Sequence, residues 1–245
     1  MKKKNLCLLI SLLLIVIGSV ISYQVDTDWG QIETTRIKIN DKDGFEVSAN
    51  LYIPKSATSQ SPAPAMIISP GGDCPSDLAS PWASELARRG YVVAAADYSG
   101  SGDTQVNPSS QYFGSNGSMS LDTIYDYLAN CNFVNSEQIG VGGHSMGSLY
   151  SYRLALQRKV SLVISDVLFT DEMPDYNFNF FQISATHDEG ILARLNTFDD
   201  IYKDAFLTQL FNTETIVPEQ IYGSFDENNV RVMYTLNQTH QDDMI

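Results

Sequence analysis

Gly143-His144-Ser145-Met146-Gly147 is the stretch of sequence that decides how this chain folds. It is a G-x-S-x-G pentapeptide, preceded by an apolar run typical of a strand (138–141) and followed by apolar residues at helical spacing (148–156). A serine on so sharp a turn has a strained backbone, and side chains two residues away would clash, which explains Gly143 and Gly147. The turn lifts the Ser145 hydroxyl above the sheet edge and points the Met146 amide at the same space. The pentapeptide therefore predicts a strand, a nucleophilic serine and a helix, in that order.

The rest of the chain alternates between strand and helix patterns. Two alternating segments flank a turn-rich cluster at 40–44 and predict a hairpin, and several later runs are apolar throughout, as in buried parallel strands. We expect strands at 32–40, 45–53, 65–68, 91–96, 138–142, 160–165, 178–185 and 230–236, and helices at 84–89, 121–129, 149–157 and through most of 191–210. This order predicts an α/β fold, a mostly parallel sheet with helices on both faces and an N-terminal antiparallel hairpin.

A chain of 245 residues is long enough for one well-buried α/β domain and too short for two comfortable ones. We place this domain at 32–245, after a polar joint at 24–31. Residues 1–23 have the pattern of an export signal, because Lys2-Lys3-Lys4 precede an apolar stretch at 6–21. The lysines should stay in the cytoplasm, with the domain outside it, anchored in the membrane or secreted. No A-x-A motif precedes Tyr23, so cleavage stays open, with a slight preference for an uncleaved anchor.

Charge and cysteine content restrict the partners. A net charge of −14 argues against nucleic acid, because binding phosphates requires clustered lysine and arginine, and we interpret the acidity as a source of solubility. Export would expose Cys74 and Cys131 to an oxidising compartment, but the strand order places them on opposite edges of the sheet, so we expect no disulfide. We expect no cofactor and no metal. The expected partners are a small-molecule substrate and, through the N-terminal segment, a membrane; the oligomeric state stays open.

A serine hydroxyl needs a base to take its proton, and the base needs a partner that holds its tautomer. Asp188 follows one expected strand and His240 follows the last, so both should lie on the edge where Ser145 opens. We therefore expect Ser145, Asp188 and His240 to form a catalytic triad. The alternatives are a helix N-cap role for Asp188 and a loose tail position for His240. His144 should be structural, and His187 no more than a loop residue.

An oxyanion that develops on the substrate needs two fixed donors. The Met146 amide is one, and the loop at 69–73 should supply the other, because adjacent glycines let a backbone approach a substrate closely. We expect the Gly72 amide to be this donor and Gly71 to shape the turn. An ordinary tight turn is the alternative.

With these motifs, residues 31–245 resemble the α/β-hydrolases. The segment 65–72 is similar to that fold's third strand and oxyanion loop, 97–103 to its D-x-x-G-x-G loop, 141–147 to its nucleophile elbow and 185–188 to its acid loop. The Ser-Pro-Gly form of the oxyanion loop is closest to dienelactone-hydrolase-like and cutinase-like or platelet-activating-factor-acetylhydrolase-like esterases. The resemblance implies hydrolysis of esters or related acyl bonds through an acyl-enzyme on Ser145. Pro70 and Ala185 depart from the pattern. The chain also ends five residues after His240, where relatives continue into a helix, so we expect a possible truncation.

The substrate mouth should be open, because only about a dozen residues, 166–177, stand where this fold usually inserts a lid. The side chains expected to line the mouth, and to disfavour anionic substrates, are those of Tyr98, Tyr112, Phe113, Asp171, Glu172 and Asp175. The alternative is that they are solvated loop residues.

Other functions of the same fold remain. A peptidase is disfavoured because such enzymes usually carry an added propeller or cap domain. An inactive surface binding module would typically lack the serine or the histidine. An acyltransferase would use the same triad and is not separated from a hydrolase by the sequence.

Overall fold

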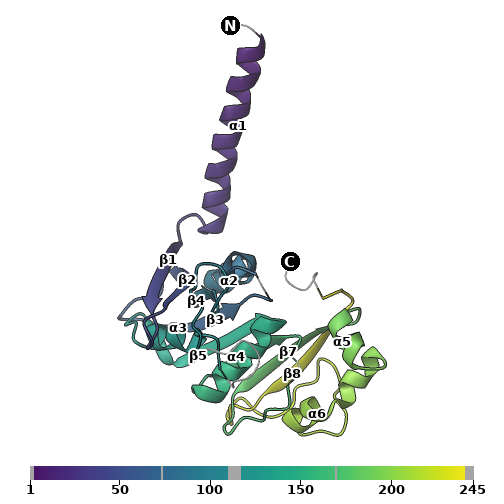
Figure 1. Ribbon diagram of the computed structural model, residues 1–245. Helices are drawn as coiled ribbons and strands as arrows, with labels where there is room; N and C mark the ends of the chain where they lie inside the picture. The colour runs from purple at the N-terminus through teal and green to yellow at the C-terminus, as the bar shows by residue number, and fades with distance from the viewer. Residues whose placement is uncertain (1–2, 73, 110–116, 169, 241–245) are drawn as a thin grey trace.

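The computed structural model describes residues 3–72, 74–109, 117–168 and 170–240, and a single mixed sheet forms its centre (Figure 1). Within these residues the sheet has eight strands in the order β1-β2-β4-β3-β5-β6-β7-β8. β2 runs antiparallel to both β1 and β4, and all other neighbours are parallel. The strands are β1 (Ile32–Asn40), β2 (Glu46–Pro54), β3 (Ala63–Ser69), β4 (Val92–Ala96), β5 (Val134–His144), β6 (Leu162–Asp166), β7 (Asn179–Ala185) and β8 (Arg231–Leu236). The expected N-terminal hairpin and mostly parallel sheet are confirmed.

Helices cover both faces of the sheet. α2 (Ser80–Arg88) packs on one face, where Ala83 joins an apolar cluster with Met66 and Ile68 of β3. α3 (Leu121–Ala129) and α4 (Met146–Gln157) belong to a larger cluster that contains Ile67. Because neighbouring residues of a strand point to opposite faces, Ile67 faces away from Met66 and Ile68, and the two clusters lie on opposite sides of the sheet.

The helix expected through most of 191–210 is wrong. The structure has three short helices there: α5 (Glu189–Arg194), the 3-10 helix η2 (Phe198–Lys203) and α6 (Ala205–Phe211). The Asp200 carboxylate accepts a hydrogen bond from the Thr197 amide at 2.8 Å, and the Asp204 carboxylate accepts one from the Leu207 amide at 3.0 Å. These acidic side chains accept hydrogen bonds from backbone N–H groups where a new helix begins. The helical spacing of apolar residues therefore continues along the sequence, although the helix itself is interrupted.

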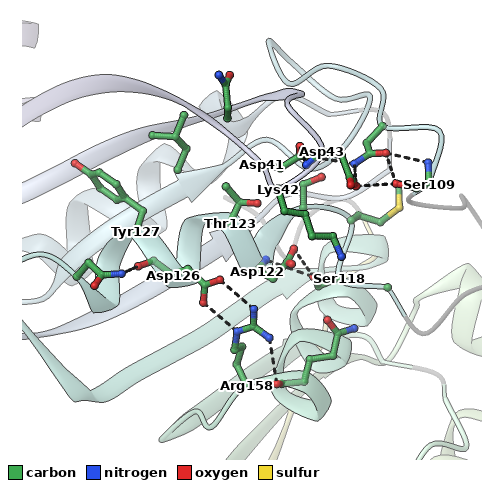
Figure 2. A pocket seen from close by; sticks show the side chains of 18 of the residues that line it. Asp41, Lys42, Asp43, Ser109, Ser118, Asp122, Thr123, Asp126, Tyr127 and Arg158 are labelled. Carbon is green, nitrogen blue, oxygen red and sulfur yellow. Dashed lines mark hydrogen bonds and ion pairs between the residues drawn. The ribbon is translucent and has the colours of Figure 1, made fainter.

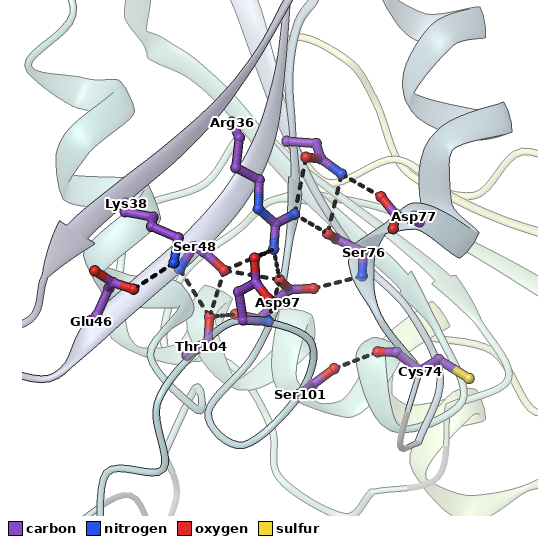
Figure 3. A network of polar contacts seen from close by, with 12 residues as sticks. Arg36, Lys38, Glu46, Ser48, Cys74, Ser76, Asp77, Asp97, Ser101 and Thr104 are labelled. Atoms are coloured by element: carbon purple, nitrogen blue, oxygen red, sulfur yellow. Dashed lines mark hydrogen bonds and ion pairs between the residues drawn. The ribbon is translucent and has the colours of Figure 1, made fainter.

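A buried carboxylate ties the first half of the sheet together (Figure 3). Asp97 directly follows β4, and its side chain contacts the Arg36 guanidinium from β1 and the Ser48 hydroxyl of β2. It also accepts the amide of Ser76 at 2.6 Å, in the 3-10 helix η1 (Ser76–Ala79), and that of Asp103 at 3.1 Å. Burial raises the pKa of Asp97, but these hydrogen bonds outweigh it and hold the pKa below its ordinary value. The network fixes the start of η1, and with it the end of the loop after β3.

The N-terminal segment is a single helix that leaves the domain (Figure 1). α1 (Lys3–Asp26) extends three residues beyond the expected segment at 1–23. Its residues 4–26 are long and apolar enough to cross a membrane, and most of its large apolar side chains are exposed. The Arg88 guanidinium of α2 donates to the Val25 carbonyl at 2.7 Å, so the end of α1 lies beside α2.

Candidate active site

The elbow between β5 and α4 holds Ser145 in the conformation that its sequence requires. Ser145 has φ 53° and ψ −117°, outside the regions that non-glycine residues ordinarily occupy. Its amide donates to the Asp166 carbonyl of β6 at 2.8 Å, which anchors the turn to the neighbouring strand. A Cβ at Gly143 would lie 2.5 Å from the Ser69 carbonyl oxygen, and one at Gly147 would overlap that same oxygen. Both positions therefore require glycine, because the end of β3 approaches the elbow backbone so closely.

The ends of β7 and β8 bring Asp188 and His240 together. Nδ1 of His240 lies 2.6 Å from Oδ2 of Asp188, whose side chain is fully buried. The other carboxylate oxygen of Asp188 accepts the Ile191 amide at 2.8 Å, so Asp188 also caps α5. The two roles considered for Asp188 are thus compatible, since each uses a different oxygen. An imidazole that donates Nδ1–H to a carboxylate has Nε2 free to act as a base.

His144 belongs to the elbow, and its side chain contacts His240. Its Nε2 is 2.8 Å from the carbonyl oxygen of His240, and the two ring centroids are 4.5 Å apart. Burial, and then the proximity of His240, lower the pKa of His144. This contact joins residues 96 positions apart, and the sequence pattern gave no sign of it beyond the position of His144 next to Ser145.

The loop after β3 lies directly against the elbow. A Cβ at Gly71 would be 2.9 Å from Nδ1 of His144 and 3.7 Å from Cβ of Ser145. A Cβ at Gly72 would be 2.6 Å from Sδ of Met146. Gly71 and Gly72 therefore lie next to His144 and Met146, the residues before and after Ser145 in the chain. Met146 is the first residue of α4, where a backbone amide has no partner within the helix.

Comparison with solved structures identifies the fold. The esterase Pf2001 of Pyrococcus furiosus superposes with a TM-score of 0.57 at 15% identity, over 85% of each chain. Oligopeptidase B of Leishmania major gives a TM-score of 0.61 at 13% identity, over 86% of this chain and 34% of that one. This chain has the α/β-hydrolase fold. A sequence relative is the uncharacterized protein YcjY of Escherichia coli, 28% identical over 114 residues, or 46% of this chain and 37% of YcjY. No family model matches the chain.

Tyr98 does not line the mouth of this hydrolase fold. Its side chain is fully buried, and its hydroxyl donates to the Gly71 carbonyl at 2.8 Å. The ring packs against Tyr150 of α4, with centroids 5.2 Å apart. An aromatic residue two positions after a buried strand fits either a mouth or a support beneath the loop, and burial favours the second.

The other expected mouth residues fall into two groups. Tyr112 and Phe113 lie outside the described residues. Asp171 and Asp175 are exposed, whereas Glu172 is half-buried and pairs with Arg153 of α4 at 3.3 Å. These three acidic residues belong to the connection from Asp166 to Asn179, whose described part contains no helix. The expected absence of an inserted lid domain stays a prediction.

A separate cavity is lined by none of Ser145, Asp188 and His240, and Figure 2 shows side chains that line it. It has a volume of about 750 Å³ and lies between the β1–β2 turn, α3 and Arg158. Several of its charged groups have partners: Arg158 binds both carboxylate oxygens of Asp126 at 3.0 Å, and Asp43 accepts hydrogen bonds from Asn107 and Ser109. Among the described residues no group of three or more His, Cys, Asp or Glu side chains could hold a metal ion.

Proposed function

We propose that this chain is a serine hydrolase that cleaves carboxylic esters or related acyl bonds. The observation that carries the proposal is the 2.6 Å contact between His240 and buried Asp188, at the edge of the sheet where the strained Ser145 also opens. Structural constraints alone do not require a histidine on a buried carboxylate at the same sheet edge as a serine with positive φ. A site that must lower the pKa of a hydroxyl does require it.

The roles follow from the chemistry of each group. His240 donates Nδ1–H to Asp188, so Nε2 takes the proton as the Ser145 oxygen attacks the substrate carbonyl. The carbonyl oxygen becomes negatively charged, and the amides of Gly72 and Met146 stabilise it. His240 then returns the proton to the leaving alcohol, and an acyl-enzyme remains on Ser145. A water molecule, activated by the same Nε2, releases the acid and restores the serine.

The proposed substrate is a small neutral ester. The acidic side chains of the β6–β7 connection and the net charge of −14 oppose the approach of anions. Turnover of matched p-nitrophenyl esters, one neutral and one with a terminal carboxylate, tests this directly. Equal kcat/KM values for the two would contradict the proposed preference. An alcohol acceptor added to the same assay separates an acyltransferase, which yields a new ester, from a hydrolase.

The test of the activity itself is labelling with a fluorophosphonate probe, which forms a bond with an activated serine. The wild-type chain should be labelled, and Ser145→Ala should not. His240→Ala and Asp188→Asn should lower the rate by roughly 10³-fold or more, because triad members act as a unit. His187→Ala is the matched control, since His187 adjoins Asp188 but donates only its backbone amide, to Gln238.

Three outcomes contradict the proposal. An unlabelled wild-type chain would favour a binding module of this fold. Labelling that persists in Ser145→Ala would assign the reactivity to another serine. Retention of full reactivity in Asp188→Asn would remove the Asp188–His240 pair from the mechanism.

A further inference from the structure

His144 occupies a position from which it contacts both the elbow and the histidine of the proposed triad. Its backbone directly precedes Ser145, and its side chain is 6% exposed. Its Nε2 lies 2.8 Å from the carbonyl oxygen of His240. One side chain therefore links the segment that carries the nucleophile to the segment that carries the base.

The partner of His144 determines its tautomer. A carbonyl oxygen can only accept a hydrogen bond, so Nε2 of His144 must carry the proton. Burial keeps the ring neutral at ordinary pH, because it lowers the pKa of His144. Nδ1 is then unprotonated; it is buried against Gly71, with no hydrogen-bond partner among the described residues. The ring therefore has a single N–H donor, and the carbonyl oxygen of His240 accepts its hydrogen bond.

His240 needs such an anchor because β8 ends four residues before it, at Leu236. Beyond the strand, the Leu236 carbonyl accepts the Thr186 amide at 2.8 Å, and the Gln238 carbonyl accepts the His187 amide at 3.0 Å. Asp188 holds the ring of His240 through Nδ1. A ring held at one nitrogen can still swing with its own backbone. The bond from His144 to the His240 carbonyl restrains that backbone.

We propose that His144 is a positioning residue that sets the distance between the base and the nucleophile by holding the His240 carbonyl. The inference rests on the proposed function, because it assigns His144 a task within the same site. His144 does not exchange a proton with the substrate. Its neutrality also matters, since a charged ring 4.5 Å away would oppose the positive charge that His240 acquires during catalysis.

The test compares His144→Leu with His144→Gln in the full chain. Leucine fills the space and removes the donor, whereas glutamine restores an N–H at a similar reach. We expect His144→Leu to lower kcat for a p-nitrophenyl ester roughly 10- to 100-fold with little change in KM, since small displacements of a catalytic group have effects of this size. His144→Gln should recover most of the loss. His187→Leu and His187→Gln are the matched controls and should resemble the wild type.

A second readout does not depend on activity. The Nδ1 proton of His240, shared with Asp188, should give a far-downfield proton resonance, which should broaden or shift in His144→Leu and return in His144→Gln. Unchanged kcat and an unchanged resonance in His144→Leu would overturn the inference. If the wild type shows no Ser145-dependent labelling, the proposed function fails and the catalytic assignment of His144 fails with it. The resonance then still reports whether His144 restrains His240.

Discussion

At the scale of single residues, the orientation of the peptide bond between Gly71 and Gly72 decides where the N–H of the loop after β3 points. The Tyr98 hydroxyl donates to the Gly71 carbonyl at 2.8 Å. In a trans peptide, the N–H of the following residue points opposite to that carbonyl. Tyr98 therefore fixes the direction of the Gly72 N–H, the proposed oxyanion donor, from a buried position that a substrate does not reach.

Tyr98→Phe should lower kcat by about tenfold and leave KM nearly unchanged, because the donor acts on charge that develops only in the transition state. The loss should be smaller than that of a missing donor, since the Gly72 amide remains present. Tyr125→Phe is the matched control, because the Tyr125 hydroxyl also donates to a carbonyl, that of Lys159, at 2.7 Å. Steady-state kinetics of both variants check this. Equal kcat values in the two variants would mean that Tyr98 only supports the fold.

The sequence allowed a prediction of the elbow and of the residues beside it, but not of contacts made by long-range packing. Asp188 and His240 lie together, as expected from their positions after two neighbouring parallel strands, and their catalytic roles stay predictions. Tyr98 was expected at the mouth, and the structure buries it. His144 was expected to be structural, and its contact with the carbonyl of His240 was not foreseen. The surroundings of Tyr98 and His144 depend on which distant segments pack together, and the local sequence pattern carries no information on that packing.

At the scale of elements, strands were easier to predict than helix ends. Short apolar runs such as Val92–Ala96 identify buried strands, because few other elements tolerate burial on both faces. The helix expected at 191–210 was wrong because apolar spacing was given more weight than capping residues. Thr197 followed by Asp200, and Asp204 before an apolar run, are visible in the sequence as helix starts.

The network around Asp97 gives a prediction at the same scale. Arg36→Met would leave the buried Asp97 carboxylate without its cationic partner, so the free energy of unfolding should fall by about 2 kcal/mol. Lys38→Met is the control from the same strand, because Lys38 pairs with Glu46 in solvent and its loss should change little. Urea unfolding at pH 7 measures both. Equal stability of the two variants would show that the amides of Ser76 and Asp103 suffice for Asp97.

The same network predicts how the stability of the folded protein changes with pH. The pKa of Asp97 is lower in the folded state than the ordinary value, so its stabilising contribution is present above that ordinary value. The contribution is lost as the pH falls from that ordinary value toward the lowered pKa, because the unfolded chain takes up the proton before the folded protein does. Unfolding at pH 3 should therefore require less urea than at pH 7, and Asp97→Asn should weaken this dependence.

At the scale of the whole molecule, the chain combines a domain with a buried core and a helix with an exposed apolar surface. Most large apolar side chains of α1 are exposed, since the helix extends away from the domain (Figure 1). An apolar surface of this length is stable in a bilayer and unstable in water. The exposed Trp29, just after α1, has the residue type that is enriched where a helix leaves the hydrocarbon. We therefore expect α1 to be inserted and the domain to lie close to the membrane surface.

Fractionation of the full chain tests this arrangement. The full chain should sediment with membranes and resist extraction with alkaline carbonate, whereas a chain that begins at Thr27 should be soluble and keep its melting temperature, because the sheet begins at Ile32. A full-length double variant, Leu13→Arg with Ile15→Arg, is the control, since a charge at mid-bilayer costs about 2.5–3.5 kcal/mol on insertion scales. An intact mass that corresponds to a chain starting at Tyr23 would show instead that the segment is a cleaved signal. A full chain that is soluble without cleavage would contradict both forms of the idea, because the α1 surface would then need a protein partner.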